Sequence, residues 1–201
     1  MNHFITIGRE FGSGGHKIGQ ILSEQLGFSY YDNELITLAA QRGNLNEQKL
    51  GSFDEKKHNA YLYEINYEGN QNVAKGDSFS NTLYQLQKDV ILDIAKMQNA
   101  IFVGRCADYI LKEADIPVLS VFISAPMEYR LKRTMEIQGL DEKTVLSLIK
   151  KKDKTRKKYY ESRTGNIWGS PDSYDLFFDS SKESFNEIAA QIISKFNSLY
   201  H

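Results

Sequence analysis

A glycine-rich stretch near the start of the chain, Ile7–Gly19 with the sequence IGREFGSGGHKIG, decides the fold. An apolar run, residues 4–8, leads into it, and apolar residues at helical spacing follow it, which is the strand–turn–helix context of a phosphate cradle. Glycines let successive backbone N–H groups turn toward phosphate oxygens, and the helix N-terminus adds partial positive charge. We therefore expect this stretch to bind the phosphates of a nucleotide. The candidate phosphate-binding residues are Gly12, Ser13, Gly14, Gly15, His16 and Lys17.

The stretch departs from the strict P-loop pattern G-x-x-x-x-G-K-[ST]. When residues are counted back from the helix, Gly14 falls at the second glycine and Gly15 takes the place of the lysine. Lys17 comes two residues late, and no serine or threonine follows to hold Mg²⁺ in the usual way. The alternative is a glycine turn without a ligand, but four glycines in eight residues (12, 14, 15 and 19) exceed the needs of one tight turn.

Outward from this stretch, apolar runs alternate with helical patterns along the chain. Strands rich in Val, Ile and Phe that alternate with helices favour a parallel sheet covered on both faces. We therefore predict an α/β fold in a single domain spanning residues 1–201. The expected strands are residues 4–8, 100–104, 118–124 and 174–179, with a brief extra strand at 28–31 and a closing amphipathic helix at 185–196.

Two segments fit this alternation poorly. Residues 43–80 are polar and rich in Asn, Gly and Tyr, and we expect an insertion of short helices and loops there. Residues 141–163 read as one long helix whose apolar stripe gives way to a basic run at 150–158. That run has little apolar surface, so we expect it to project into solvent or over a ligand.

Composition narrows the class of partner. The chain has 201 residues and a net charge of −1, so no overall field favours nucleic acid or an acidic membrane. The single cysteine, Cys106, and four scattered histidines argue against a disulfide and against a Cys- or His-based metal site. The chain lacks a signal-peptide pattern and a membrane-spanning run, so we expect a cytoplasmic protein.

Several motifs beyond the glycine stretch resemble one family. The run from Ile5 to Gly15, together with Leu26–Asp32, looks like the cytidylate-kinase-like family, relatives of the nucleoside monophosphate kinases within the P-loop NTPase superfamily. Val103–Asp108 is similar to the family's Gly-Arg turn, and Lys152–Arg156 resembles the Arg-Asp-x-x-Arg signature of its lid helix. The resemblance implies a three-layer kinase fold with an acceptor-binding insertion and following helix at about 33–98 and a helical lid at about 130–165.

The same resemblance implies roles for charged residues. Arg105 and Arg156 would grip the phosphate of the acceptor, and Asp153 its base or sugar. Arg130 and Arg133 would face the donor phosphates, although helices also carry solvated arginines routinely. The cofactors implied are ATP and Mg²⁺, the latter held mostly by phosphates and water rather than by protein ligands. The candidate catalytic cations are Lys17, Arg130, Arg133 and Arg156.

Three further residues carry open alternatives. Asp32 follows the second expected strand and would either bind a ribose hydroxyl or base amine of the substrate or cap a helix that begins at Asn33. Trp168 lies in a glycine-rich loop, where it would either stack on a base or anchor the loop against the core. The lysines of the 150–158 run would either bind a ligand or form a solvated helix face.

These features predict ATP-dependent phosphoryl transfer to a small acceptor, by resemblance a nucleoside monophosphate such as CMP or dCMP. A nucleotide-binding regulatory module without catalysis is the alternative, because Gly15 replaces the P-loop lysine. An RNA-associated protein that uses the basic helix is a third hypothesis, although nucleic acid is disfavoured by the low net charge. The expected partners are small nucleotides, and the oligomeric state does not follow from one sequence.

Overall fold

A five-stranded parallel sheet forms the centre of the computed structural model, which describes residues 2–43 and 79–200. The strand order is β2-β3-β1-β4-β5, so the strand that leads into the glycine stretch lies in the middle. Ile5 of this central strand lies opposite Ile101 on one side and Leu119 on the other. The strands are β1 (Phe4–Arg9), β2 (Ser29–Tyr31), β3 (Ala100–Val103), β4 (Leu119–Ser124) and β5 (Leu176–Asp179).

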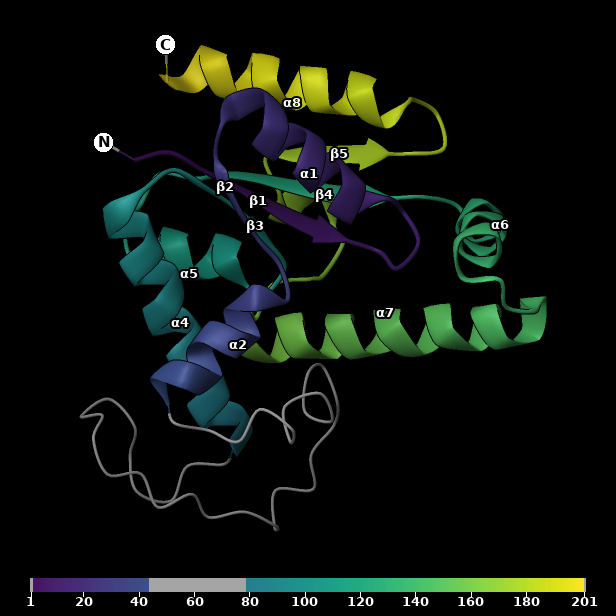
Figure 1. The fold of residues 1–201 in the computed structure, drawn as a ribbon, viewed down its shortest axis with the longest axis horizontal. Helices are drawn as coiled ribbons and strands as arrows, with labels where there is room; N and C mark the ends of the chain where they lie inside the picture. The colour runs from purple at the N-terminus through teal and green to yellow at the C-terminus, as the bar shows by residue number, and fades with distance from the viewer. Residues whose placement is uncertain (1, 44–78, 201) are drawn as a thin grey trace.

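Helices cover both faces of the sheet (Figure 1). On one face α1 and α8 pack on Ile5, Ile7 and their neighbours, and on the other α2, α4 and α5 pack around Phe4 and Phe102. Apolar residues on both faces explain why the strands read as continuous hydrophobic runs. These helices are α1 (Gly15–Leu26), α2 (Glu34–Arg42), α4 (Phe79–Met97), α5 (Ala107–Glu113) and α8 (Phe185–Tyr200).

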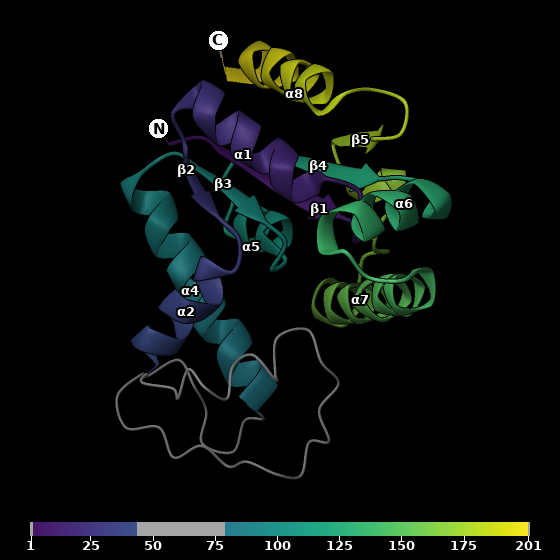
Figure 2. The same ribbon diagram turned by 45° about the vertical axis from the view of Figure 1, so that its right-hand side comes forward.

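Two helices, α6 (Met127–Gln138) and α7 (Glu142–Thr164), lie beyond the carboxyl ends of the strands (Figure 2). Asp141 caps the N-terminus of α7, because its Oδ1 accepts a hydrogen bond from the Thr144 N–H at 3.0 Å. Val145 and Ile149 are buried on one side of α7, and Tyr160 is buried in its last turns. A short 3-10 turn, residues Pro171–Ser173, leads from α7 toward β5.

The predicted α/β class, the parallel sheet and the five strands are confirmed, with strand ends shifted by one or two residues. The long helix expected at 141–163 is also confirmed. One of its faces is exposed to solvent, and the other carries the buried residues Val145, Ile149 and Tyr160. The short helices and loops expected at 43–80 fall largely on residues 44–78, outside the described part. Within the described ranges no helix has the length and apolar character needed to cross a membrane.

Candidate active site

The glycine loop joins β1 to α1 and owes its shape to two close contacts. Gly12 and Gly14 have φ angles of +84° and +91°, which residues with a side chain rarely adopt. A Cβ atom on Gly12 would lie 2.7 Å from the Thr134 Oγ1, and one on Gly14 would overlap the Phe185 ring. The loop is therefore pressed between α6 and the start of α8, and its glycines are needed for packing as well as for any ligand.

A groove of about 440 Å³ opens over this loop and the first turn of α1. The first N–H groups of a helix have no partner within the helix, so the N-terminus of α1 offers donors and partial positive charge here. Arg133 lies at the rim, where its Nη1 donates to the Gly12 carbonyl at 3.3 Å and its guanidinium stands over the Phe185 ring. The groove is lined by Arg9, Glu10, Phe11, Gly12, Gly14, Gly15, His16, Lys17, Gln20, Asp32, Arg133, Thr134, Ile137, Gln138 and Arg156.

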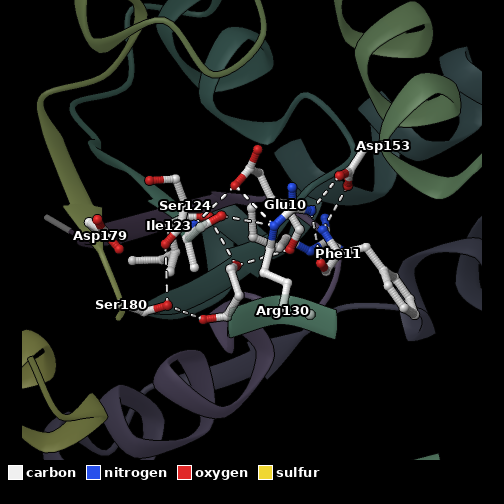
Figure 3. Close-up of polar contacts among 12 residues, drawn as sticks. Glu10, Phe11, Ile123, Ser124, Arg130, Asp153, Asp179 and Ser180 are labelled. Carbon is white, nitrogen blue, oxygen red and sulfur yellow. Dashed lines mark hydrogen bonds and ion pairs between the residues drawn. The ribbon is translucent and has the colours of Figure 1, made fainter. Parts of the chain in front are cut away.

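Ser13, expected among the phosphate-binding residues, turns its side chain into the protein. Its buried hydroxyl donates to the Glu10 carbonyl at 2.9 Å and lies 3.0 Å from the Ile123 carbonyl. The Ser180 hydroxyl in turn donates to the Ser13 carbonyl at 2.6 Å (Figure 3). The Ser13 hydroxyl thus fastens the loop to the sheet.

A buried ion pair holds the other side of the loop (Figure 3). Arg130, whose side chain is 6% exposed, donates through Nη1 to the Asp153 Oδ2 at 2.5 Å and to the Phe11 carbonyl at 3.1 Å. The Asp153 Oδ1 accepts from the Phe11 N–H at 2.7 Å. Glu10 completes this group, because its Oε2 lies 3.5 Å from the Arg130 Nε, and burial raises the pKa of its carboxyl.

This group places Arg130 and Asp153 differently from what the resemblance implies. Arg130 was expected to face donor phosphates and Asp153 the acceptor's base or sugar. Here both bind each other and the backbone of Phe11, so they tie α6 and α7 to the glycine loop. A sequence pattern does not reveal the contact between Phe11 and Asp153, since these residues lie 142 positions apart.

A second polar cluster lies where β1 and β2 end. The Arg9 Nη2 donates to the Asp32 Oδ1 at 3.2 Å, and the His16 Nδ1 lies 2.9 Å from the Asp32 Oδ2. The helix-cap alternative for Asp32 is therefore wrong, because both of its carboxylate oxygens are turned toward Arg9 and His16, and α2 begins only at Glu34. His16 is exposed, whereas Asp32 is buried.

The turn after β3 brings Arg105 to the same edge of the sheet. Gly104, Arg105 and Cys106 all have positive φ angles, of +79°, +61° and +55°. Side-chain-bearing residues held in this region cluster at functional sites. The Arg105 Nη2 donates to the Asn33 Oδ1 at 3.2 Å, which connects the turn to the start of α2.

A small cavity of about 30 Å³ lies between the ends of β1 and β3, Arg105 and the last turns of α7, next to the groove. Asp108 is buried beside it and accepts a hydrogen bond from the Tyr160 hydroxyl at 2.6 Å, and burial raises the pKa of its carboxyl. Burial also raises the pKa of the Cys106 thiol. The lining residues are Thr6, Ile7, Gly8, Arg9, Gly104, Arg105, Cys106, Asp108, Arg156, Tyr159, Tyr160, Trp168 and Tyr174.

Arg156 is the arginine of α7 that lines both the groove and the cavity. Its Nη1 donates to the Arg9 carbonyl at 3.2 Å, and its guanidinium stands 5.6 Å from the centre of the Phe11 ring.

Two other predicted residues lie apart from this cluster. Lys17 is exposed at the groove. Trp168 packs edge-on against Phe122 at 5.3 Å between ring centres, and this contact anchors its loop.

The sequence left open whether the basic run of α7, residues 150–158, binds a ligand or forms a solvated helix face, and its residues divide between two orientations. Most of its lysines form a solvated face, and Asp153 and Arg156 turn toward the loop. The exposed lysines are Lys150, Lys151, Lys154, Lys157 and Lys158.

Sequence reasoning missed Arg9 and Glu10. Both follow the central strand directly, at the carboxyl edge where open α/β sheets bind ligands, and that position was the available signal. In the described part of the chain no group of three or more His, Cys, Asp or Glu side chains is arranged to hold a metal ion.

Comparison with known proteins places the chain among kinases. The chain is 28% identical over 180 residues to a cytidylate kinase of Methanococcus vannielii, and the alignment covers 89% of this chain and 90% of that protein. A cytidylate kinase of Methanocaldococcus jannaschii is 29% identical over 92 residues, 45% of this chain and 52% of that protein.

Solved structures agree on the architecture. An uncharacterised protein from Eubacterium ventriosum superposes with a TM-score of 0.73 at 28% identity, over 98% of this chain and 99% of that one. A shikimate kinase from Bacteroides thetaiotaomicron gives a TM-score of 0.55 at 12% identity, over 98% of each chain, which is a likeness of fold alone. The fold is that of the P-loop kinases. The sequence model of the cytidylate kinase-like family matches residues 4–182, and this chain therefore belongs to that family.

Proposed function

We propose that this protein transfers the terminal phosphoryl group of ATP to a nucleoside monophosphate, with CMP or dCMP as the acceptor. Family and fold support a phosphotransferase, and the names of the archaeal relatives supply the acceptor class. One observation carries the proposal: Arg156 lines both the groove over the glycine loop and the cavity beneath Arg105. One guanidinium can therefore contact a phosphate in the groove and a phosphate in the cavity.

The donor would lie in the groove, with its phosphates over the glycine loop and the N-terminus of α1. Arg133 stands at the rim with further N–H donors, since a guanidinium has five. Mg²⁺ would be held mainly by donor phosphates and water, with Glu10 as the carboxylate nearest to them at the groove, since both oxygens of Asp32 are engaged by Arg9 and His16. When bound, the ion neutralises charge on the transferred group.

The acceptor would lie on the cavity side, its phosphate between Arg105 and Arg156. Phosphoryl transfer depends on positioning and on neutralising charge as it redistributes among phosphate oxygens. Arg130 and Asp153 act in this proposal as positioning residues, because they fix the loop through Phe11 and do not reach the phosphates themselves.

An ADP-release assay tests the proposal. Purified protein is given ATP and Mg²⁺ with CMP, dCMP, UMP, AMP, shikimate or gluconate, and ADP release is coupled to NADH oxidation. Acceptor-dependent release with CMP or dCMP is expected. Arg105→Ala and Arg156→Ala should each lower kcat/KM at least about 100-fold, since each removes a charge contact to the reacting phosphates.

Lys157→Ala is the matched control, because this exposed cation follows Arg156 on α7 and pairs only loosely with Glu161 at 3.9 Å. It should keep the wild-type rate. Release with shikimate or gluconate in place of nucleotides would contradict the acceptor class. ATP binding without release for any acceptor would favour the non-catalytic regulatory module.

A further inference from the structure

We propose that Arg9 replaces the missing P-loop lysine and that its guanidinium contacts the terminal phosphates of ATP. This inference rests on the proposed function, because it assigns a catalytic cation to the same groove. It makes Asp32 and His16 the residues that position that cation.

The first observation is what fills the space beside Gly15. This glycine begins α1 and stands where the P-loop pattern has its lysine. A Cβ atom built on Gly15 would lie 2.7 Å from the Arg9 Cβ and 3.1 Å from the Arg9 Cγ. The volume into which a lysine would project is therefore taken by the side chain of Arg9, which explains why residue 15 has none.

The second observation is where the guanidinium goes. The Arg9 Nη2 donates to the Asp32 Oδ1 at 3.2 Å, and a Cβ atom on Gly104 would overlap the Arg9 Nη1. Arg9 thus runs across the carboxyl edge of the sheet from β1 toward the turn after β3. Its side chain is 11% exposed and yet lines the groove.

A guanidinium held in this way suits a polyphosphate. Asp32 accepts from one of its five N–H donors, and the planar group can present two others in parallel to phosphate oxygens. His16 lies on the second oxygen of Asp32, so the carboxylate is fixed from both sides. Fixing the cation before ATP binds reduces the entropy lost on binding.

Lys17 fits this role less well. It lies two residues beyond Gly15, and successive residues of an α-helix are rotated by about 100°, so its Cβ points roughly 200° around the helix from that of residue 15. Its side chain is exposed. Arg133 comes from α6 rather than from the turn between β1 and α1, and its Nη1 is engaged with the Gly12 carbonyl.

The test moves the positive charge from residue 9 to residue 15. Arg9→Gly removes the guanidinium and the Cβ that blocks residue 15, and it should lower acceptor-dependent kcat at least 100-fold. Gly15→Lys alone should also be impaired, because its Cβ meets Arg9. The double variant Arg9→Gly/Gly15→Lys should regain at least tenfold over Arg9→Gly, because the ammonium now has room.

The matched control is Arg9→Gly/Gly15→Ala, which adds the same Cβ without a charge and should regain nothing. Arg9→Met keeps the apolar stem, so it protects against loss of folding, which circular dichroism monitors. By calorimetry, Arg9→Met should weaken binding of ATP tenfold or more and leave binding of AMP within twofold.

Two results would overturn the inference: an Arg9→Met variant that keeps wild-type ATP affinity and kcat, or a double variant no more active than its alanine control. Failure of the proposed function looks different. In that case wild type shows no acceptor-dependent release, while calorimetry still compares ATP affinity between wild type and Arg9→Met.

Discussion

The groove and the cavity, which share Arg9 and Arg156, differ in how much room they offer. The groove over the glycine loop measures about 440 Å³ and is bordered by backbone, carboxylates and arginines. The cavity near Arg105 measures about 30 Å³. Four aromatic side chains line it: Tyr159, Tyr160, Trp168 and Tyr174.

The difference shows two ways of preparing a binding site. The groove is fixed by backbone geometry, since Gly12 and Gly14 admit no side chain and the Arg130–Asp153 pair holds Phe11 in place. The cavity is lined by aromatic side chains, of which Tyr160 is held by its hydrogen bond to Asp108. In our proposal the donor phosphates meet a prepared loop, whereas the acceptor site must widen, because a cavity of about 30 Å³ is too small for a nucleotide.

The largest expected effect comes from breaking the groove side alone. Asp153→Ala should lower the free energy of unfolding by about 3 kcal/mol, because it leaves the buried Arg130 without its closest carboxylate and frees the Phe11 N–H. It should also weaken ATP binding, since the loop loses its tie to α7. Urea unfolding and calorimetry measure the two effects.

Asp141→Ala on the same helix is the control for that variant. It removes the N-cap of α7 at a cost of about 1 kcal/mol and does not touch the loop, so ATP affinity should be unchanged. Equal losses of ATP affinity in the two variants would mean that general loosening of α7, rather than the tie to Phe11, controls the groove.

A smaller effect is expected on the cavity side, from pH. Burial raises the pKa of the Asp108 carboxyl above its ordinary value, so the folded protein keeps a proton there that the unfolded chain has already released. Stability therefore falls as pH rises from about 4 through the native pKa, by about 1.4 kcal/mol for each pH unit by which the pKa is raised.

Asp108→Asn removes this dependence and can still accept from the Tyr160 hydroxyl. The difference in unfolding free energy between variant and wild type should thus move in favour of the variant between pH 4 and pH 7. Asp172→Asn, at an exposed carboxylate, should follow the wild-type pH profile. A constant difference for Asp108→Asn across this range would contradict a raised pKa.

A last prediction concerns access to the cavity and involves no change in stability. Cys106 lines the small cavity and its thiol is buried with a raised pKa, so Ellman's reagent should label it roughly 100-fold or more slowly in the native protein than in urea. A cysteine introduced by Lys157→Cys in a Cys106→Ser background should react quickly in both conditions. Fast native labelling of Cys106 would show that the cavity opens freely.

Much of the fold followed from local patterns. The apolar runs predicted the strands because each buried strand needs apolar residues on both faces, and the brief strand at 28–31 became β2. The start of the long helix at about residue 141 also followed from local periodicity, and α7 begins at Glu142.

The candidate site was predicted less completely. The loop glycines, His16 and Lys17 line the groove, but Ser13 turns into the protein, Arg130 and Asp153 bind each other, and Arg9 was missed. Arg156, predicted at the acceptor phosphate, lines both the groove and the cavity. The partner of a charged side chain depends on which distant elements pack beside it, and a motif specifies only the position of that residue along the chain.

By itself the sequence determined the succession of strands and helices along the chain and the glycine turn after the first strand, because these depend on periodicity and on neighbouring residues. The resemblance to the family rested on short motifs, which are also local. Only the tertiary structure decided the charge pairs: Arg130 with Asp153 across 23 positions, and Arg9 with Asp32 also across 23. Such partners are set by how α6, α7 and the strand ends pack at one edge of the sheet. That packing also filled the place of the absent lysine with Arg9, because a side chain on Gly15 and the stem of Arg9 cannot occupy the same volume.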